Sequence, residues 1–232
     1  MNYVFDVDGT LTPSRLPIDK EFETFFLKWM EDKNVYLVTG SDRIKTVEQV
    51  GETIWNKCTR VYQSCGNAVY QGGQLIDKKR FDLNPELKKL LLEFVEYSEC
   101  PKQFKNHIEE RIGLVNFSPI GRSCPQEARE EYYKWDLNHK ERERFCMIIE
   151  DQFPELEATV GGQISIDIYP IGRDKSQVLD HIKGPITFFG DKCELGGNDY
   201  SIVQRLGKED RESIVHKVSE YKDTWKALLK LG

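Results

Sequence analysis

Continuous apolar runs alternate with amphipathic, helix-forming stretches near the N-terminus, and this alternation limits the chain to a small set of folds. Residues 3–5 and 35–38 form short apolar runs, and residues 19–32 place aromatic and aliphatic side chains at helical spacing. A further helix is expected to end near residue 56. Strands without polar alternation are buried on both faces, so the pattern predicts a parallel sheet covered by helices on either side.

The middle of the chain follows a different order. Residues 61–77 contain two glycine turns and predict a hairpin, and residues 84–97 predict a helix. Strands are then expected at residues 107–111, 114–118 and 159–169, with a long charged helix over much of residues 125–152. Strands and helices grouped in this way favour an α+β domain.

The first pattern resumes after residue 172, with a helix at 176–181, a strand at 185–189 and a charged helical tail. The predicted fold class is therefore an α/β, Rossmann-like parallel-sheet core with an inserted α+β cap. The expected boundaries are 1–79 and 172–232 for the core and 80–171 for the cap.

Composition excludes several classes of partner. The net charge of -6 provides no general field for nucleic acid or an anionic membrane surface. No run approaches the roughly 20 apolar residues of a membrane span, and acidic residues interrupt the apolar stretch that an N-terminal signal peptide would need. The six cysteines show no CxxC pair, which is typical of free thiols in a reducing compartment, so a cytoplasmic location is expected.

An acidic loop follows the first predicted strand. Asp6-Val7-Asp8-Gly9-Thr10 lies where open α/β sheets bind ligands, beyond the carboxyl end of a strand. Asp6 can attack phosphorus as a nucleophile, and Asp8 can donate a proton to the leaving oxygen and later withdraw one from the acceptor. Both carboxylates can also approach one divalent cation. The alternative interpretation is a solvated acidic turn.

Other polar side chains follow later strands. Thr39, with Ser41 as a second candidate, can hydrogen-bond a phosphoryl oxygen, and Lys175 can place a positive charge beside the same group. Asp191 and Asp199 add carboxylates for a metal. Taken singly, such residues are more often helix caps, surface lysines or turns. In this chain order, they indicate one magnesium-dependent phosphoryl-transfer site.

These four motifs resemble those of the haloacid dehalogenase superfamily, and the second aspartate of the first motif favours phosphate chemistry. Over nearly the whole chain the sequence also resembles eukaryotic phosphomannomutases. The segments that carry this resemblance are Asp6 to Thr12 with Arg15, the run from Asn116 to Cys124, and the run from Gly161 to Asp167.

The cap contains candidate groups for a sugar phosphate. Arg111, Arg122 and Arg129 can each hold a phosphate through two hydrogen bonds, although ion pairs with Glu109, Glu110 or Glu127 would also explain them. Ser165 and Asp167 alternate on one face of a strand and can bind sugar hydroxyls. The resemblance adds Arg15 and Asn116 to the predicted substrate-binding residues.

The resemblance implies interconversion of mannose 1-phosphate and mannose 6-phosphate, with glucose phosphates as further substrates. It also implies a phosphoaspartate at Asp6, Mg²⁺, a hexose 1,6-bisphosphate activator and a homodimer joined through the cap. A sugar-phosphate phosphatase and a non-catalytic sugar-phosphate binding protein are the alternatives. Residues 200–207 depart from the family pattern, because this segment is short and lacks an aspartate that helps form a second cation site.

Overall fold

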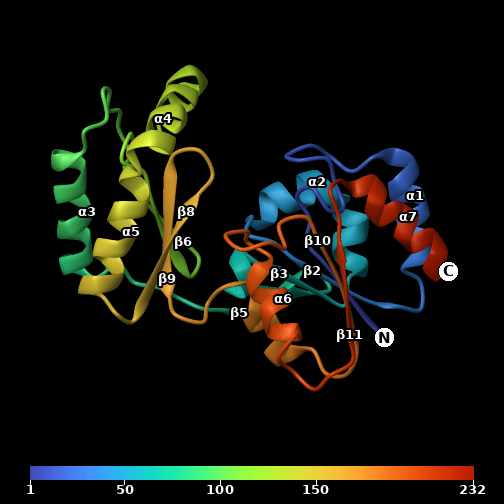
Figure 1. Cartoon of the computed structure of the whole chain (residues 1–232). Helices are drawn as coiled ribbons and strands as arrows, with labels where there is room; N and C mark the ends of the chain where they lie inside the picture. Colours follow the sequence, from blue (N-terminus) through green and yellow to red (C-terminus); the bar gives the residue numbers. More distant parts are fainter. The chain divides into compact units, whose positions relative to one another are not determined.

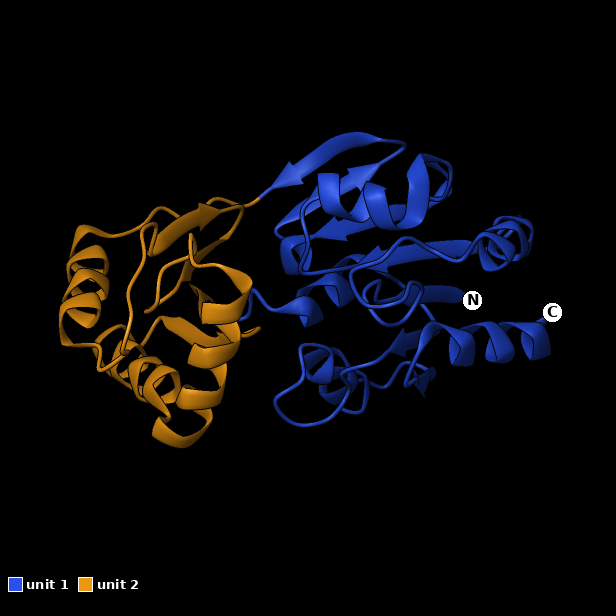
Figure 2. Cartoon of the chain, turned by 90° about the horizontal axis from the view of Figure 1, so that it is seen from above, with its two compact units in different colours: residues 1–78, 172–232 blue, residues 79–171 orange.

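The computed structural model describes all residues from 1 to 232 and divides the chain into two compact units (Figure 2). Unit 1 contains residues Met1–Lys78 and Gly172–Gly232, and unit 2 contains residues Lys79–Ile171. Each unit has its own sheet. The chain therefore leaves unit 1 once, builds unit 2 and returns to complete the first sheet.

Unit 1 is built on a seven-stranded sheet with the order β11-β10-β1-β2-β3-β4-β5 (Figure 1). The first five strands in this order are parallel, and β4 and β5 are antiparallel. The strand bounds are β1 Asn2–Phe5, β2 Asn34–Val38, β3 Arg60–Gln63, β4 Ala68–Gln71, β5 Gln74–Lys78, β10 Ile186–Gly190 and β11 Ser213–Lys217. The predicted parallel sheet is thus confirmed, with an antiparallel hairpin at one edge.

Helices cover both faces of this sheet. Apolar side chains of α1, α2 and α7 pack against one face, and those of η2 and α6 pack against the other. The bounds are α1 Lys20–Trp29, α2 Arg43–Lys57, η1 Ser64–Gly66, η2 Lys175–His181, α6 Tyr200–Leu206 and α7 Tyr221–Leu231. Phe5 of β1 and Val4 beside it point to opposite faces and join the two cores. Burial of the central strands on both faces explains why they lack polar alternation.

Unit 2 is an antiparallel four-stranded sheet with the order β6-β7-β9-β8. Its strands are β6 Ile108–Arg111, β7 Leu114–Phe117, β8 Leu156–Gly161 and β9 Ser165–Pro170, and its helices are α3 Pro85–Tyr97, α4 Gln126–His139 and α5 Glu141–Gln152. Helices α3 and α5 pack on one face through a core that includes Phe117, Phe145 and Ile166. Because side chains alternate along a strand, Asn116 and Asp167 point away from this core.

Three segments differ from the sequence prediction. The long charged helix is two helices, because Lys140 adopts a left-handed conformation with φ 55° between α4 and α5. The predicted strand at 159–169 is the hairpin of β8 and β9, which turns at Gly162. The charged tail includes β11, whose pairing with β10 the local sequence did not indicate. No helix has the length and apolar character needed to cross a membrane.

Candidate active site in unit 1 and polar face of unit 2

Asp6 lies directly after β1 and is almost completely buried, with 3% of its surface exposed. Its Oδ1 accepts a hydrogen bond from Lys175 Nζ at 2.6 Å, and its Oδ2 accepts one from the Thr10 hydroxyl at 3.0 Å. Burial and the charge of Asp199 together raise the pKa of Asp6 to about 7, although Lys175 opposes both effects. Both carboxylate oxygens are therefore held in fixed positions in a dry environment.

Lys175 joins two of the predicted carboxylates. It is fully buried, and its Nζ also donates to Asp199 Oδ1 at 2.7 Å. Burial alone would lower the pKa of Lys175, but the charges of Asp199 and Asp6 raise it above the ordinary value. The lysine is therefore a permanent cation between two carboxylates.

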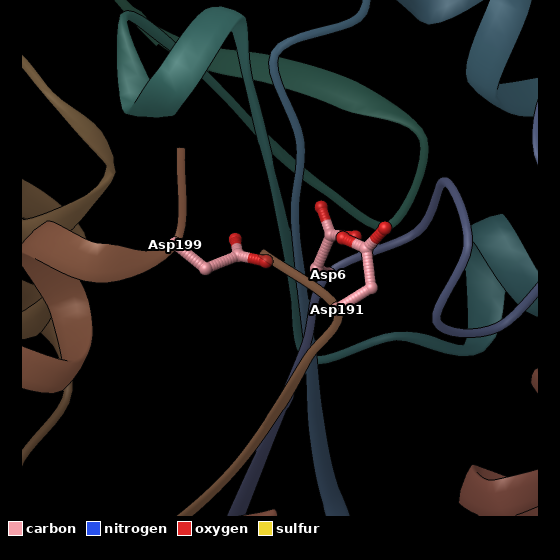
Figure 3. Close-up of side chains that lie close together, drawn as sticks. All are labelled: Asp6, Asp191 and Asp199. Carbon is pink, nitrogen blue, oxygen red and sulfur yellow. The ribbon is translucent and has the colours of Figure 1, made fainter. Parts of the chain in front are cut away.

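The side chains of Asp6, Asp191 and Asp199 converge at the carboxyl end of the sheet (Figure 3). Each offers a carboxylate oxygen, and these three oxygens lie within 4.8 Å of one another. Burial is the main cause that raises the pKa of Asp191. The Lys192 cation lowers this pKa, and the negative charge of Asp199 raises it. Three carboxylates and one lysine leave an excess of two negative charges, which a divalent cation would balance. Hard oxygen ligands suit Mg²⁺, so the residues present fit such an ion.

Two glycines allow these carboxylates to approach. Gly9 has φ 92°, and a Cβ at this position would lie 2.5 Å from Asp191 Oδ2. A Cβ at Gly190 would lie 2.7 Å from Asp199 Oδ2. The acidic cluster therefore depends on backbone segments that pack directly against its oxygen atoms.

The Asp8 carboxylate lies outside this group of three. Its Oδ1 accepts hydrogen bonds from the backbone N–H of Arg15 and from Gln49 Nε2, the second at 3.0 Å. Gln49 is buried in α2 and also donates to the Thr12 hydroxyl at 3.1 Å. The structure thus groups three of the four predicted metal ligands and holds the fourth carboxylate by a different set of donors.

The predicted hydroxyl groups lie at the same edge of the sheet. Phe5 of β1 is the register partner of Leu37 in β2, so Asp6 and Thr39 both follow the ends of neighbouring parallel strands. Thr39 is buried, and its hydroxyl oxygen accepts a hydrogen bond from the Ser41 backbone N–H at 3.0 Å. This acceptor role leaves the Thr39 hydroxyl hydrogen available to a phosphoryl oxygen.

Unit 2 carries a polar row on the face of its sheet opposite α3 and α5. The register aligns Glu109, Asn116, Asp167 and Thr159 across neighbouring strands. Asn116 Nδ2 donates to Asp167 Oδ1 at 2.6 Å. Burial raises the pKa of Asp167, and the hydrogen bond from Asn116 lowers it. The two sugar-binding candidates on β7 and β9 are therefore in direct contact.

Two of the three predicted arginines share one glutamate in unit 2. Arg111 Nη2 lies 2.6 Å from Glu109 Oε2, and Arg122 Nε lies 2.8 Å from the same oxygen. Arg122 Nη1 also donates to Asn116 Oδ1 and, at 3.5 Å, to Ser165 Oγ. Burial lowers the pKa of Arg122, and the charges of Arg111 and Arg129 lower it further, whereas Glu109 raises it. Three guanidinium groups set against the carboxylates of Glu109 and Asp167 leave one positive charge in excess for a bound phosphate.

Comparison with known proteins identifies the family. The model of the eukaryotic phosphomannomutase family matches residues 22–231. The chain belongs to the eukaryotic phosphomannomutase family. It is 38% identical to a phosphomannomutase of Galdieria sulphuraria, with 96% of this chain and 91% of the relative covered. Identity to the phosphomannomutase of Saccharomyces cerevisiae is 34%, with 98% and 92% of the two chains covered.

Solved structures support the fold. A haloacid dehalogenase-like hydrolase from Bacteroides thetaiotaomicron matches with a TM-score of 0.64 at 13% identity, covering 99% of this chain and 98% of that one. At this identity the likeness concerns the fold alone. The α/β core with an inserted α+β unit, predicted from the sequence, is thus confirmed as the architecture of this family member.

Sequence reasoning missed three residues that support the candidate groups, two of them within unit 1 and one within unit 2. Gln49 contacts Asp8 across a separation of 41 residues, and Thr224 of α7 donates its buried hydroxyl to the Thr10 carbonyl at 2.7 Å. Arg142 is buried in unit 2 behind the β8–β9 turn. None of the three could be found from the sequence, because each contact joins segments that are separated in the chain.

Proposed function

We propose that this chain is a phosphohexomutase that interconverts mannose 1-phosphate and mannose 6-phosphate, and accepts glucose phosphates as further substrates. The observation that carries the proposal is the buried Asp6, whose two oxygens are fixed by Lys175 and Thr10 beside two further carboxylates. Membership of the eukaryotic phosphomannomutase family supplies the substrate class.

Asp6 acts as the nucleophile in this proposal. One of its oxygens forms a bond to phosphorus while the bond from phosphorus to the sugar oxygen breaks, which leaves a phosphoaspartate. The Lys175 cation and the Thr39 hydroxyl stabilise the negative charge that develops on the phosphoryl oxygens. The phosphoaspartate forms first from the hexose 1,6-bisphosphate activator and passes its phosphoryl group to the free 6-hydroxyl of mannose 1-phosphate, as the bond from phosphorus to Asp6 breaks. Asp6 then takes the phosphoryl group from C1 of the resulting bisphosphate, which releases mannose 6-phosphate.

Asp8 acts as the general acid and base. The Arg15 N–H and Gln49 both donate to its Oδ1, so the proton that moves to and from the sugar oxygen belongs on Oδ2. This orientation follows from the acceptor capacity of a carboxyl group, because a protonated Oδ1 has fewer lone pairs with which to accept both bonds. Asp8 therefore reaches the sugar oxygen with a defined atom.

We propose Mg²⁺ as the cation that Asp6, Asp191 and Asp199 hold, whereas the Asp8 carboxylate, expected from the sequence as a fourth ligand, lies outside this group and is assigned to proton transfer. When bound, Mg²⁺ supplies charge neutralisation for the phosphoryl group and for the carboxylates around it. The buried Lys175 ammonium adds one positive charge to the two that Mg²⁺ would bring to the site.

Unit 2 supplies the groups that recognise the sugar phosphate. Arg111, Arg122 and Arg129 bind the phosphate that does not react, and Arg15 is a separate substrate-binding candidate within unit 1. Asn116, Ser165 and Asp167 bind sugar hydroxyls, and their direct contacts fix the directions of their hydrogen bonds. We further propose a homodimer formed through unit 2, a hexose 1,6-bisphosphate activator and a cytoplasmic location.

A product-resolved assay tests this function. Purified protein with Mg²⁺ is incubated with mannose 1-phosphate, with and without a catalytic amount of hexose 1,6-bisphosphate, and mannose 6-phosphate and inorganic phosphate are measured separately. We expect mannose 6-phosphate to dominate and the bisphosphate to accelerate its formation. Release of inorganic phosphate without mannose 6-phosphate would identify a sugar-phosphate phosphatase instead, and no turnover would indicate a binding protein.

A further inference from the structure

Unit 2 contains a buried ion pair that lies behind the polar face. Arg142 at the start of α5 is 2% exposed, and its Nε lies 2.7 Å from Asp136 Oδ2 in α4. The backbone N–H of Arg142 also donates to Asp136 Oδ1 at 3.0 Å. Both oxygens of Asp136 are therefore engaged by a single residue.

The other end of this guanidinium group is attached to the β8–β9 turn. Arg142 Nη1 donates to the carbonyl oxygens of Gly162 at 3.1 Å, Ser165 at 3.3 Å and Gly161 at 3.4 Å. A lysine ammonium group has a single nitrogen atom. It could not bond Asp136 on one side and the three carbonyl oxygens on the other, as the separate Nε and Nη1 atoms of the guanidinium group do. The arginine thus fixes both ends of the turn against α4.

This turn carries the groups proposed to bind sugar hydroxyls. Ser165 begins β9, and its hydroxyl is within 3.5 Å of Arg122 Nη1. The Asp167 carboxylate packs over Gly161, where a Cβ would lie 2.8 Å from Oδ2. A shift of the turn would therefore move the serine hydroxyl and change the space around the aspartate.

Asp136, the acidic partner in the ion pair, lies on α4, the helix that also carries the phosphate-binding candidate Arg129. Asp136 and Arg129 are seven residues apart in α4, so they lie on the same side of the helix, two turns from each other. The positive charge of Arg129 lowers the pKa of Arg122, so the two arginines interact electrostatically. The ion pair therefore connects the helix of Arg129 to the turn of Ser165.

We propose that Arg142 and Asp136 are positioning residues that set the distance between the phosphate-binding guanidinium groups and the hydroxyl-binding side chains of unit 2. The proposal rests on the sugar-phosphate function proposed above. Buried ion pairs add little net stability compared with apolar side chains of similar volume, so a geometric role accounts better for this one. The pair contacts Ser165 only through its backbone carbonyl and does not contact the ligand-binding side chains, so it favours ligands in which phosphate and hydroxyls stand at the correct separation.

Two ligands of different size distinguish this role from simple support of the fold. Inorganic phosphate needs only the guanidinium groups, whereas mannose 6-phosphate needs these groups and the hydroxyl-binding side chains together. Affinities of the full chain for both are measured by calorimetry for the wild type, Arg142→Lys and Asp136→Asn. We expect Arg142→Lys to weaken mannose 6-phosphate binding by about tenfold or more, the equivalent of one charge-assisted hydrogen bond, and phosphate binding by much less.

Tyr132→Phe provides a matched control. The substitution removes only the hydroxyl, which donates to Glu141 Oε2 at 3.1 Å, and keeps the ring that packs with Ile164 and lies beside the Arg142 guanidinium. The variant should lose stability while keeping the ratio of the two affinities.

The ratio of affinities decides the outcome. Equal weakening of both ligands in Arg142→Lys, or no weakening of either, overturns the positioning role. If that variant does not fold, Asp136→Asn carries the same test, because its amide keeps the volume and loses the charge. A wild-type protein that binds mannose 6-phosphate no better than phosphate overturns the proposed substrate site itself, which is a separate result from loss of the positioning role.

Discussion

Replacement of Asp6 by asparagine should stabilise the metal-free protein at neutral and alkaline pH while abolishing turnover. The asparagine amide keeps the shape of the side chain and can still accept a hydrogen bond from Lys175, but it carries no charge. The Asp6 carboxylate is buried beside Asp199, and these two effects raise its pKa from 3.8 to about 7 despite the opposing lysine. The ionised Asp6 carboxylate therefore lowers the free energy of unfolding when no cation is bound.

The direction and size of the effect follow from proton linkage. Because the folded pKa lies above the unfolded value, the folded state binds more protons over this interval, and the contribution of Asp6 to stability is lost as pH rises through about 7. A shift of about three pKa units corresponds to about 4 kcal/mol. The free energy of unfolding of Asp6→Asn, relative to the wild type, should therefore rise by about this amount between pH 4 and pH 8.

Urea denaturation in the presence of a chelator, followed by tryptophan fluorescence across this pH range, measures the difference. Asp151→Asn, which removes an exposed carboxylate from α5, controls for the loss of one negative charge. With saturating Mg²⁺ the order should reverse, because only the wild type keeps the complete ligand set. A difference between Asp6→Asn and wild type that stays constant with pH would refute the idea that burial and Asp199 destabilise this carboxylate.

Three further variants test other parts of the structure. Arg122→Ala should weaken hexose-phosphate binding by about 1.5–3 kcal/mol, the value of a charge-assisted hydrogen bond, as measured by calorimetry. Gly9→Ala should reduce Mg²⁺ affinity in a calorimetric titration, since the new Cβ would lie 2.5 Å from Asp191 Oδ2 at a φ of 92°. Thr224→Val should lower the free energy of unfolding by about 1–3 kcal/mol, because the buried Thr10 carbonyl loses its donor. Thr224→Ser, which keeps the hydroxyl, should retain most of that stability, and equal losses in both variants would contradict the hydrogen-bond explanation.

The parallel core could be predicted because its signal is local. Residues of β1 and β2 form continuous apolar runs, and a polar loop follows each strand directly. Parallel strands must end at the same edge, so sequence order alone brought Asp6 and Thr39 to one side of the sheet. The same reasoning could not find β11, because Ser213 to Lys217 are identified as a strand chiefly by pairing with β10.

The helix over residues 125–152 shows a second limit. Its composition is continuous and charged, and no glycine or proline marks the break at Lys140. The left-handed conformation at this residue is maintained by the contacts on either side, including the buried pair of Asp136 and Arg142. Those contacts join residues of two helices, and their side chains become neighbours only after the chain turns between α4 and α5.

The amino-acid sequence by itself determined the alternating elements of the parallel core, where the polar loops follow its strands, and which carboxylates, lysine and arginines are available for phosphate chemistry. These properties depend on hydrophobic periodicity and residue type, which are encoded over a few consecutive positions. Only the tertiary structure decided that Lys175 bridges Asp6 and Asp199, that Gln49 turns Asp8 away from them, and that Glu109 is shared by two arginines. Such pairings depend on distances between segments that are far apart in the chain, and packing of the whole unit sets those distances.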